Sequence, residues 1–118
     1  MAFKLKTSKK ASEIFDRIES SENLPCYTLV KLAMALSLRS KEPLKESDFH
    51  TNTLGRELNR QTITAEWDDL YKCLIAMSEQ RHIEDDEYFQ KYIKAHLDRG
   101  AKLLYSEFRY GGDFITHL

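Results

Sequence analysis

The chain has 118 residues, of which 42% are apolar and 31% are charged, and its formal net charge at neutral pH is −1. This length fits a single domain over residues 1–118, and the apolar share excludes an intrinsically disordered chain. A net charge so close to zero also excludes binding to polyanions by bulk charge alone. Any interaction with nucleic acid must therefore come from a local basic surface.

The charges are distributed unevenly along the chain. All charged side chains among the first twelve residues are lysines, and they are Lys4, Lys6, Lys9 and Lys10. Acidic residues gather in the run from Glu84 to Glu87. Such asymmetry is typical of a protein with one basic face.

No segment of the sequence predicts a membrane span or an export signal. No stretch approaches the ~20 apolar residues of a span, and the opening residues lack an apolar signal region. Cys26 and Cys73 do not have the spacing of a zinc site. Each lies among apolar residues at helical spacing, so both are expected in the core. These features predict a cytoplasmic protein that does not associate with membranes.

Residues 3–7 alternate apolar and polar side chains, which predicts a short strand with Lys4 and Lys6 on one face. Ser8 is a suitable helix cap, and the apolar positions after it follow three-and-four spacing to about residue 20. We therefore expect a strand followed at once by a helix.

A second helix is expected over residues 25–39, because Pro25 fits the first turn of a helix. Its apolar residues surround the helix axis, and they include Leu29, Val30, Leu32, Met34, Leu36 and Leu38. A helix of this kind must be buried on more than one side. In so short a chain, this pattern predicts an interface between subunits.

The rest of the chain is less uniform. Residues 40–52 are polar and predict a loop, whereas 53–63 have no clear period and are left as irregular or a short hairpin. Apolar spacing predicts a third helix over 64–80 and a fourth over 84–111. The expected fold is mainly α, with a short N-terminal strand, a helix-turn-helix pair and two further helices in a compact oligomer.

The order strand, helix, tight turn, helix is shared with ribbon-helix-helix DNA-binding proteins. In those proteins two chains pair their strands, and the ribbon enters the major groove. Here Lys4 and Lys6 would face the DNA, and Lys9 and Lys10 would reach phosphates from the start of the helix. The alternative is a solvated edge strand whose lysines prevent aggregation. Lysines are point charges, so we expect contacts with the DNA backbone rather than with bases.

Other candidate sites are weaker. None of the histidines has the spacing of metal ligands, and they are His50, His82, His96 and His117. His96 is expected to be mostly buried with a satisfied ring, and no metal or cofactor is predicted. The acidic stretches 68–69 and 84–87 lie at predicted helix starts, where we expect solvated charges. No nucleophile arrangement or phosphate loop is present, so an enzyme is not predicted.

Four stretches, taken together, resemble the DndE family. They are FKLKTSKKASEIFDRI, LPCYTLVKLAMALSLR, LGRELNRQTITAEWDDLY and HLDRG. They extend over nearly the whole chain, and their order and spacing carry the resemblance. It implies a role in DNA phosphorothioation, in which sulfur replaces a non-bridging phosphate oxygen. It also implies a non-catalytic subunit that binds duplex DNA, including nicked duplexes, and forms a homo-oligomer such as a tetramer. The implied partners are a sulfurtransferase and an ATPase-like protein, which supply the chemistry.

Our main hypothesis is a DNA-binding subunit that uses Lys4, Lys6, Lys9 and Lys10, extended by Arg17 on the first helix. Three other arginines are weaker candidates, namely Arg56, Arg60 and Arg99. For the last of these we favour helix packing beside Gly100. Two alternatives remain open, a ribbon-helix-helix repressor and a protein-interaction scaffold.

Overall fold

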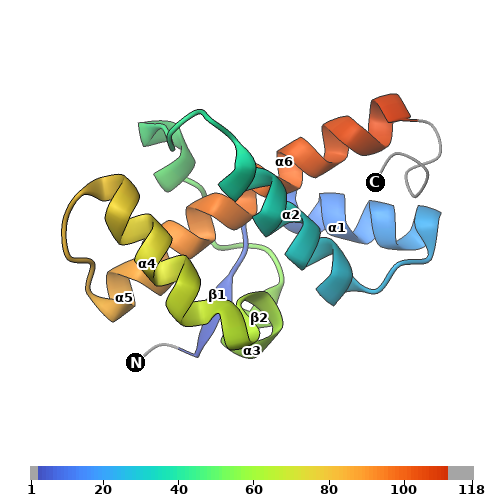
Figure 1. Cartoon of the computed structure of the whole chain (residues 1–118). Helices are drawn as coiled ribbons and strands as arrows, with labels where there is room; N and C mark the ends of the chain where they lie inside the picture. Colours follow the sequence, from blue (N-terminus) through green and yellow to red (C-terminus); the bar gives the residue numbers. More distant parts are fainter. Residues whose placement is uncertain (1–2, 112–118) are drawn as a thin grey trace.

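The computed structural model describes residues 3–111, which form a mainly helical domain with a small two-stranded sheet (Figure 1). The larger helices are α1 (Lys9–Glu22), α2 (Cys26–Arg39), α4 (Asp68–Glu79) and α6 (Lys94–Gly111). The strands are β1 (Lys4–Lys6) and β2 (Glu57–Asn59). The shorter elements are η1 (Glu46–Phe49), α3 (Arg60–Ile63), η2 (Ala65–Trp67), α5 (Asp85–Glu87) and η3 (Tyr88–Ile93). The mainly helical class and the order strand, helix, turn, helix are as predicted.

Local sequence signals define both ends of α1. The Ser8 side chain accepts a hydrogen bond from the Ala11 amide at 3.1 Å, which satisfies one of the free N–H groups of the first turn. Asn23 ends the helix in the left-handed conformation, with φ at 54°, a role that asparagine fills at helix ends. The chain then restarts as α2 directly after Pro25.

The partner of β1 is not the one that the ribbon-helix-helix comparison predicted. Strand β1 pairs in antiparallel register with β2 of the same chain, and Leu5 lies opposite Leu58. Both leucines are buried, because alternate residues of a strand face opposite sides. The ribbon is therefore complete within one chain. The unassigned stretch 53–63 contains both β2 and the short helix α3.

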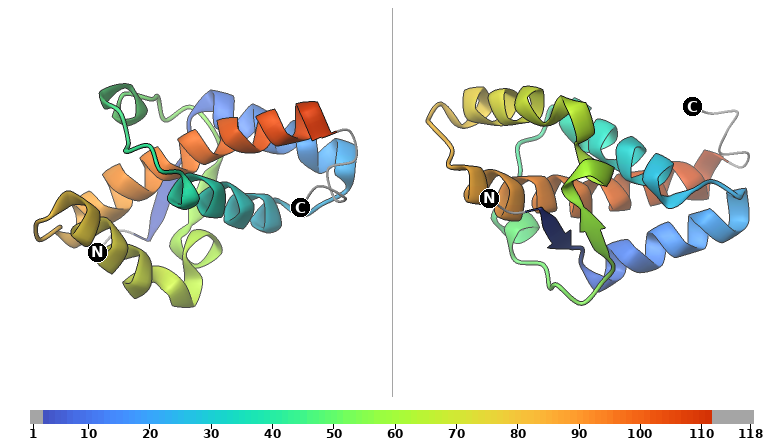
Figure 2. Two further views of the ribbon diagram at one scale, coloured as in Figure 1. Left: turned by 45° about the horizontal axis from the view of Figure 1, so that its top comes forward. Right: turned by 90° about the horizontal axis from the view of Figure 1, so that it is seen from below.

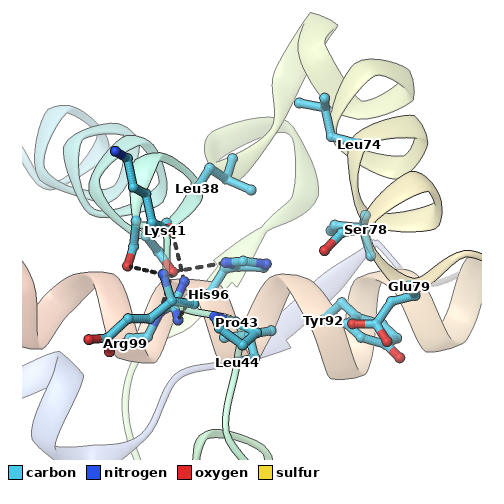
Figure 3. Close-up of a pocket in the computed structure, with 14 residues that line it drawn as sticks. Leu38, Lys41, Pro43, Leu44, Leu74, Ser78, Glu79, Tyr92, His96 and Arg99 are labelled. Atoms are coloured by element: carbon cyan, nitrogen blue, oxygen red, sulfur yellow. Dashed lines mark hydrogen bonds between the residues drawn. The ribbon is translucent and has the colours of Figure 1, made fainter.

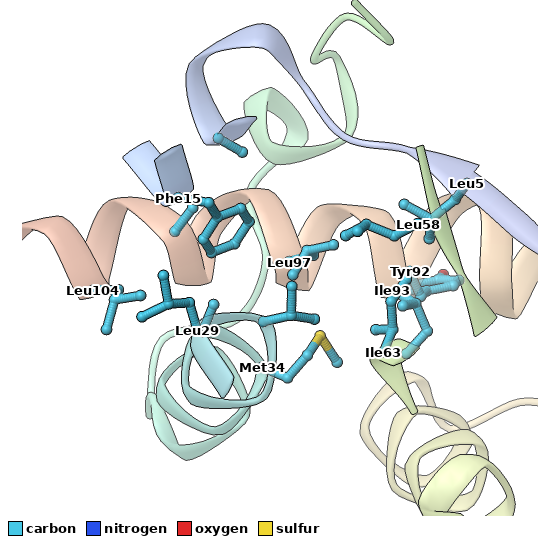
Figure 4. Close-up of a cluster of buried hydrophobic side chains, with 14 of the residues drawn as sticks. Leu5, Phe15, Leu29, Met34, Leu58, Ile63, Tyr92, Ile93, Leu97 and Leu104 are labelled. Atoms are coloured by element: carbon cyan, nitrogen blue, oxygen red, sulfur yellow. The ribbon is translucent and has the colours of Figure 1, made fainter. Parts of the chain in front are cut away.

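The core forms where α6 runs between α1 and α2 (Figure 2). Figure 4 shows Phe15, Leu29 and Leu104 packed at one end of this helix, and the strand residues Leu5 and Leu58 at the other. Gly100 lies at the closest approach of α6 and α2, since a Cβ placed there would lie 2.0 Å from the Ala33 carbonyl oxygen. The prediction that this position serves helix packing is confirmed.

Much of the apolar surface of α2 is covered within one chain. Leu29, Val30, Ala33 and Met34 are fully buried within one chain, because α6, α1 and α3 cover different sides of the helix. These four residues give no reason for a subunit interface, whereas Leu32, Leu36 and Leu38 are only partly buried, so the predicted interface on α2 stays a prediction. A charged residue at Met34 would disrupt the core of the protomer rather than a contact between protomers.

The fourth predicted helix is not regular. It begins as α5, passes through the π-helical turn η3 and continues as α6. Tyr88, Phe89, Tyr92 and Ile93 of η3 are buried. A π-helical turn shifts the side chains after it around the helix axis. Here it keeps one apolar stripe directed at the core along the whole segment.

We predict that Gly100→Ala destabilises the fold, although alanine is the better helix former by about 1 kcal/mol. The added methyl group meets backbone atoms of Ala33, which cannot rotate away. Overpacking of this kind costs about 1–3 kcal/mol. Urea unfolding followed by circular dichroism measures the change. Ser106→Ala, at an exposed position of α6, is the matched control and should not lower the stability.

Candidate nucleic-acid interface

The outer face of the ribbon carries the first two predicted lysines. Lys4 and Lys6 are exposed on either side of the buried Leu5, and they lie opposite Asn59 and Glu57 on β2. The Lys4 ammonium is 3.6 Å from the Glu57 carboxylate, and both side chains remain largely exposed. An exposed ion pair of this kind contributes little energy, so Lys4 can exchange this partner for another anion.

Lys9 and Lys10 follow at the start of α1, and both side chains are exposed. The backbone amides of Ser8, Lys9 and Ala11 in this turn are already occupied. The Lys9 amide donates to the Asn52 side chain at 2.9 Å, and the Ser8 amide donates to Asp98 at 3.1 Å. Contacts from this helix start to phosphate would therefore use the lysine side chains rather than the amides.

A buried carboxylate fixes this junction between ribbon and helix. Asp98 on α6 is only 2% exposed, and besides the Ser8 amide it binds the Thr51 hydroxyl at 2.6 Å and the Lys94 ammonium at 2.7 Å. A buried charge is stable only when it is paired and hydrogen-bonded. The three partners satisfy Asp98 and hold α1, the loop before β2 and α6 together.

Arg17 lies two helical turns after Lys10 on the same side of α1. Its guanidinium donates to the Tyr105 hydroxyl at 3.2 Å and lies 5.8 Å from the centre of that ring. Lys10, Arg17 and Tyr105 border a shallow groove between α1 and α6, with a volume of about 260 Å³. Glu13 also borders this groove, so the surface on α1 is of mixed charge.

Arg56 and Arg99 are used within the fold. Arg56 forms ion pairs with Asp16 and Glu19 of α1. Arg99 donates to the Ser37 carbonyl at 2.7 Å and to the Glu42 carbonyl at 2.9 Å, which satisfies carbonyl groups at and beyond the end of α2.

Arg60 is the centre of a charged cluster that the sequence did not reveal. Its guanidinium binds Asp68 with hydrogen bonds of 3.0 and 2.6 Å, and Asp85 with two more of 3.0 and 2.8 Å. The rings of Tyr88 and Phe89 lie 5.4 and 4.9 Å from the guanidinium carbon. Bidentate and stacked contacts of this kind suit arginine and not lysine. The cluster joins α3, α4 and the start of the last helical segment.

The cluster shifts the acidity of its members. Hydrogen bonds from Arg60 lower the pKa of Asp85 from 3.8 to about 2. Burial opposes ionisation of Asp68, but hydrogen bonds from Arg60, Thr64 and Tyr88 outweigh it and lower the pKa of that carboxyl. Asp68 and Asp85 were expected to be solvated charges at helix starts, and this prediction was wrong.

His96 faces a hollow of about 300 Å³ between α2, α4 and α6 (Figure 3). Ser37 is fully buried, and its hydroxyl lies 2.8 Å from Nδ1 of His96 and 2.9 Å from Nε of Arg99. Arginine only donates, so the serine hydroxyl accepts from Arg99, which leaves its own hydrogen available to an unprotonated Nδ1 of His96. Burial, followed by the positive charge of Arg99, lowers the pKa of His96 to about 4. The predicted buried, satisfied histidine is confirmed.

The two cysteines differ from each other. Cys26 is half-buried, but Cys73 on α4 is exposed, so its predicted place in the core was wrong. In residues 3–111 no three His, Cys, Asp or Glu side chains are grouped in a way that would hold a metal ion. None of the helices in this part of the chain has both the length and the apolar character that crossing a membrane needs. His117 lies outside the described residues.

These features define a small helical protein whose N-terminal strand and first helix carry exposed lysines on a ribbon built within one chain. The family model described as "DNA sulphur modification protein DndE" matches residues 4–110. The chain therefore belongs to the DndE family, which is involved in DNA phosphorothioation.

Solved structures of the family share this fold. DndE from Escherichia coli B7A, involved in DNA phosphorothioation modification, superposes with a TM-score of 0.69 at 14% identity, over 88% of this chain and 96% of that one. A glycine-to-lysine mutant of DndE gives a TM-score of 0.65 at 15% identity, over 87% of this chain and 97% of that one. No curated protein matches the sequence.

We predict that Arg60→Ala destabilises the protein by about 3 kcal/mol, because it leaves two carboxylates without their partner. Arg60→Lys should recover only part of this loss, since an ammonium cannot bind both carboxylates in a bidentate manner. Chemical denaturation measures both variants. Arg39→Ala, at an exposed position of α2, is the control, expected within about 0.5 kcal/mol of the parent. An equal effect of Arg39 and Arg60 would contradict a special role for the cluster.

We also predict that the free energy of unfolding falls as the pH is lowered from 6.5 toward 4. In this window the unfolded chain protonates His96, whereas the folded chain holds its pKa at about 4. The unfolded state therefore binds more protons, and stability falls by up to about 1.4 kcal/mol per pH unit. His96→Asn keeps an acceptor for Ser37 but does not titrate, so it should flatten this dependence. His50→Gln, at an exposed histidine, should leave it unchanged.

Proposed function

We propose that this protein is a non-catalytic DNA-binding subunit of the DNA phosphorothioation machinery. The proposed contacts are with the backbone of duplex DNA, intact or nicked, and the residues are Lys4, Lys6, Lys9, Lys10 and Arg17. The family membership supports the pathway. The DNA contacts rest on the arrangement of the basic side chains.

The observation that carries this proposal is the exposure of four lysines at one rigid junction. Lys4 and Lys6 project from the ribbon, and Lys9 and Lys10 follow within one helical turn of it. Among residues 3–111, Lys6, Lys9 and Lys10 form no ion pair. Their charges are available to phosphates, and the Asp98 network holds the backbone that carries them.

The chemistry of these residues favours contact with the backbone over base reading. An ammonium group is a point charge without the planar fork that recognises a base edge. Phosphate contacts position a protein on a duplex but do not carry sequence information. We therefore expect binding that depends strongly on salt and weakly on sequence.

The surroundings of Ser37 and His96 support the proposal that this subunit is non-catalytic. A serine hydroxyl 2.8 Å from an imidazole nitrogen has the spacing of a nucleophile and its base. Here the serine is fully buried, and Arg99 binds the same hydroxyl oxygen. The hydroxyl cannot reach a substrate, so the pair is structural.

The partners proposed with this function follow from the family. The sulfur chemistry then belongs to other proteins of the system, a sulfurtransferase and an ATPase-like subunit, with which this subunit assembles. We also propose that it self-associates, with a tetramer as the expected state. The near-zero net charge does not oppose association of identical chains.

One observation favours a second candidate, a sequence-specific repressor. Asn59 on β2 lies directly opposite Lys4 on the outer face of the ribbon, and asparagine is a side chain that reads adenine. A repressor would prefer one operator strongly and lose that preference on Asn59→Ala. The backbone-binding proposal expects no such preference.

The test is a titration of the parent and of the Lys4→Ala, Lys6→Ala double variant against intact, nicked and unrelated duplexes over a range of salt. Phosphate contacts by the four lysines alone give a slope of log K against log salt near −3.6, and removal of two of them should change it to about −1.8. Affinity at ~0.1 M salt should fall roughly tenfold to a hundredfold for every duplex.

The matched control is the Lys31→Ala, Lys41→Ala double variant. It makes the same change in charge at two exposed lysines on α2 and in the loop after it, and it should bind like the parent. If the ribbon variant keeps the affinity and salt slope of the parent, the DNA contacts lie elsewhere. If the parent binds no duplex at low salt, the proposal of DNA binding is wrong, and the protein-interaction scaffold becomes the favoured alternative.

A further inference from the structure

Most of the exposed apolar side chains lie on one helix and the turn before it. Seven large hydrophobic side chains among the described residues are exposed, and four of them lie on η2 and α4. These four are Trp67, Leu70, Leu74 and Met77. Their spacing of three, four and three residues places them on one side of the helix, called here the α4 stripe. Contiguous apolar surface that stays exposed is typical of an interaction site.

The α4 stripe faces outward because the opposite side of the helix is fixed. On that side Asp68 binds Arg60 at 2.6 Å, Lys72 lies 3.5 Å from Asp85, and Ile75 is buried. The helix cannot rotate to bury the stripe without breaking these ion pairs. The stripe is therefore a fixed surface of the protomer.

The segment that carries the stripe is strongly acidic. Residues 66–87 contain eight acids and two bases, which gives a formal charge of −6 with histidine neutral, although the whole chain has −1. Both bases, Lys72 and Arg81, form ion pairs with acids of the same segment. Exposed acids border the stripe at both ends of the helix, and they are Glu66, Asp69 and Glu79.

This charge selects among the possible occupants of the stripe. DNA and anionic membrane surfaces are negative, so the acids oppose their approach. A second copy placed by a twofold axis would bring an identical acidic surface against this one. A surface that carries bases beside apolar side chains is complementary in both charge and polarity. The occupant expected from these observations is therefore basic and amphipathic.

The hollow beside the stripe adds a place for an anchoring side chain. Leu74 belongs to the stripe and also borders the hollow of about 300 Å³ between α2, α4 and α6 (Figure 3). Leu38 borders the hollow from α2, and Glu79 lines it as well. An apolar helix face beside such a hollow is the arrangement by which amphipathic helices are bound in grooves. A basic side chain next to the anchor would lie near Glu79.

We propose that the α4 stripe binds an amphipathic helix of a partner protein. The apolar face of that helix covers the stripe, and its flanking lysines or arginines lie against Glu66, Asp69 and Glu79. This inference rests on the assembly with other proteins proposed above, and it names the surface and the chemistry of the partner. The stripe shares no residue with the proposed DNA contacts.

The chain carries its own reporter for this surface. Trp67 is the only tryptophan, and it is 53% exposed on the stripe. The probe is a synthetic peptide of leucine and lysine, about 18 residues or five helical turns long, with its leucines at three-and-four spacing. It should move the Trp67 emission of the full chain to shorter wavelength and reach saturation. Two peptides should not do so, a scrambled peptide of the same composition and an amphipathic peptide of leucine and glutamate.

A first pair of variants tests the apolar contact. The Leu70→Gln, Met77→Gln double variant changes two exposed side chains of the stripe, so the core of the protomer is not affected. It should bind the leucine–lysine peptide about tenfold more weakly, or weaker still. The matched control is Tyr27→Gln, Leu54→Gln, at two exposed apolar residues elsewhere, and it should bind like the parent.

A second pair of variants tests the charge. The Glu66→Lys, Glu79→Lys double variant should bind the leucine–lysine peptide about threefold to tenfold more weakly, and the leucine–glutamate peptide more tightly by a similar factor. The control is Glu13→Lys, Glu107→Lys, which makes the same change in net charge at exposed acids of α1 and α6. It should keep both affinities within about twofold of the parent, because charges far from the site are screened.

Each outcome decides between distinct claims. Equal binding of the scrambled peptide, or unchanged binding by the Leu70 and Met77 variant, overturns the proposal. A parent whose Trp67 is shielded from quenching by acrylamide also overturns it, because another copy of the chain then covers the stripe. DNA titration is a separate readout. Loss of DNA binding alone contradicts the proposed DNA contacts, and loss of peptide binding alone contradicts the α4 surface.

Discussion

Asp98 accepts hydrogen bonds from three parts of the chain that are far apart in sequence, namely the Ser8 amide, the Thr51 hydroxyl and the Lys94 ammonium. The carboxylate lies in the core, where an unpaired charge would cost several kcal/mol. In the folded chain all three donors reach this carboxylate, and their hydrogen bonds offset that cost. The start of α1, the loop before β2 and the middle of α6 are held together by this requirement. The proposed DNA-binding lysines lie directly beside this point.

Arg60 plays a comparable part for α3, α4 and the start of the last helical segment. It holds two carboxylates and lies against two aromatic rings, and this sets the rotation of α4. Leu70, Leu74 and Met77 of that helix are left in solvent, because the opposite, polar side is the one that is anchored. Burial of apolar surface normally decides which side of a helix faces inward. Here a paired charge decides it, so large apolar side chains remain exposed on one helix.

Elements that depend on local signals could be predicted from the sequence. Contacts between residues far apart in the sequence could not. The Ser8 cap and the spacing of Ile14, Phe15 and Ile18 were sufficient for α1. Strand β2 has three residues, and its partner lies about fifty positions away, so no periodicity revealed it. Asp68 and Asp85 looked like ordinary acids at helix starts because nothing in the sequence shows that Arg60 reaches both. The lysines were found from composition, and the structure adds that they are exposed at one junction.

The strand that completes the ribbon comes from the same chain. In proteins whose ribbon needs two chains, dilution separates the strands and abolishes the binding surface together with the dimer. Here each protomer carries a whole ribbon and helix start, so dilution does not separate the two strands. Under the proposed function, affinity for a long duplex is a question of avidity, in which one bound protomer raises the effective concentration of the next. The length of the duplex, rather than its sequence, would set how many protomers engage at once.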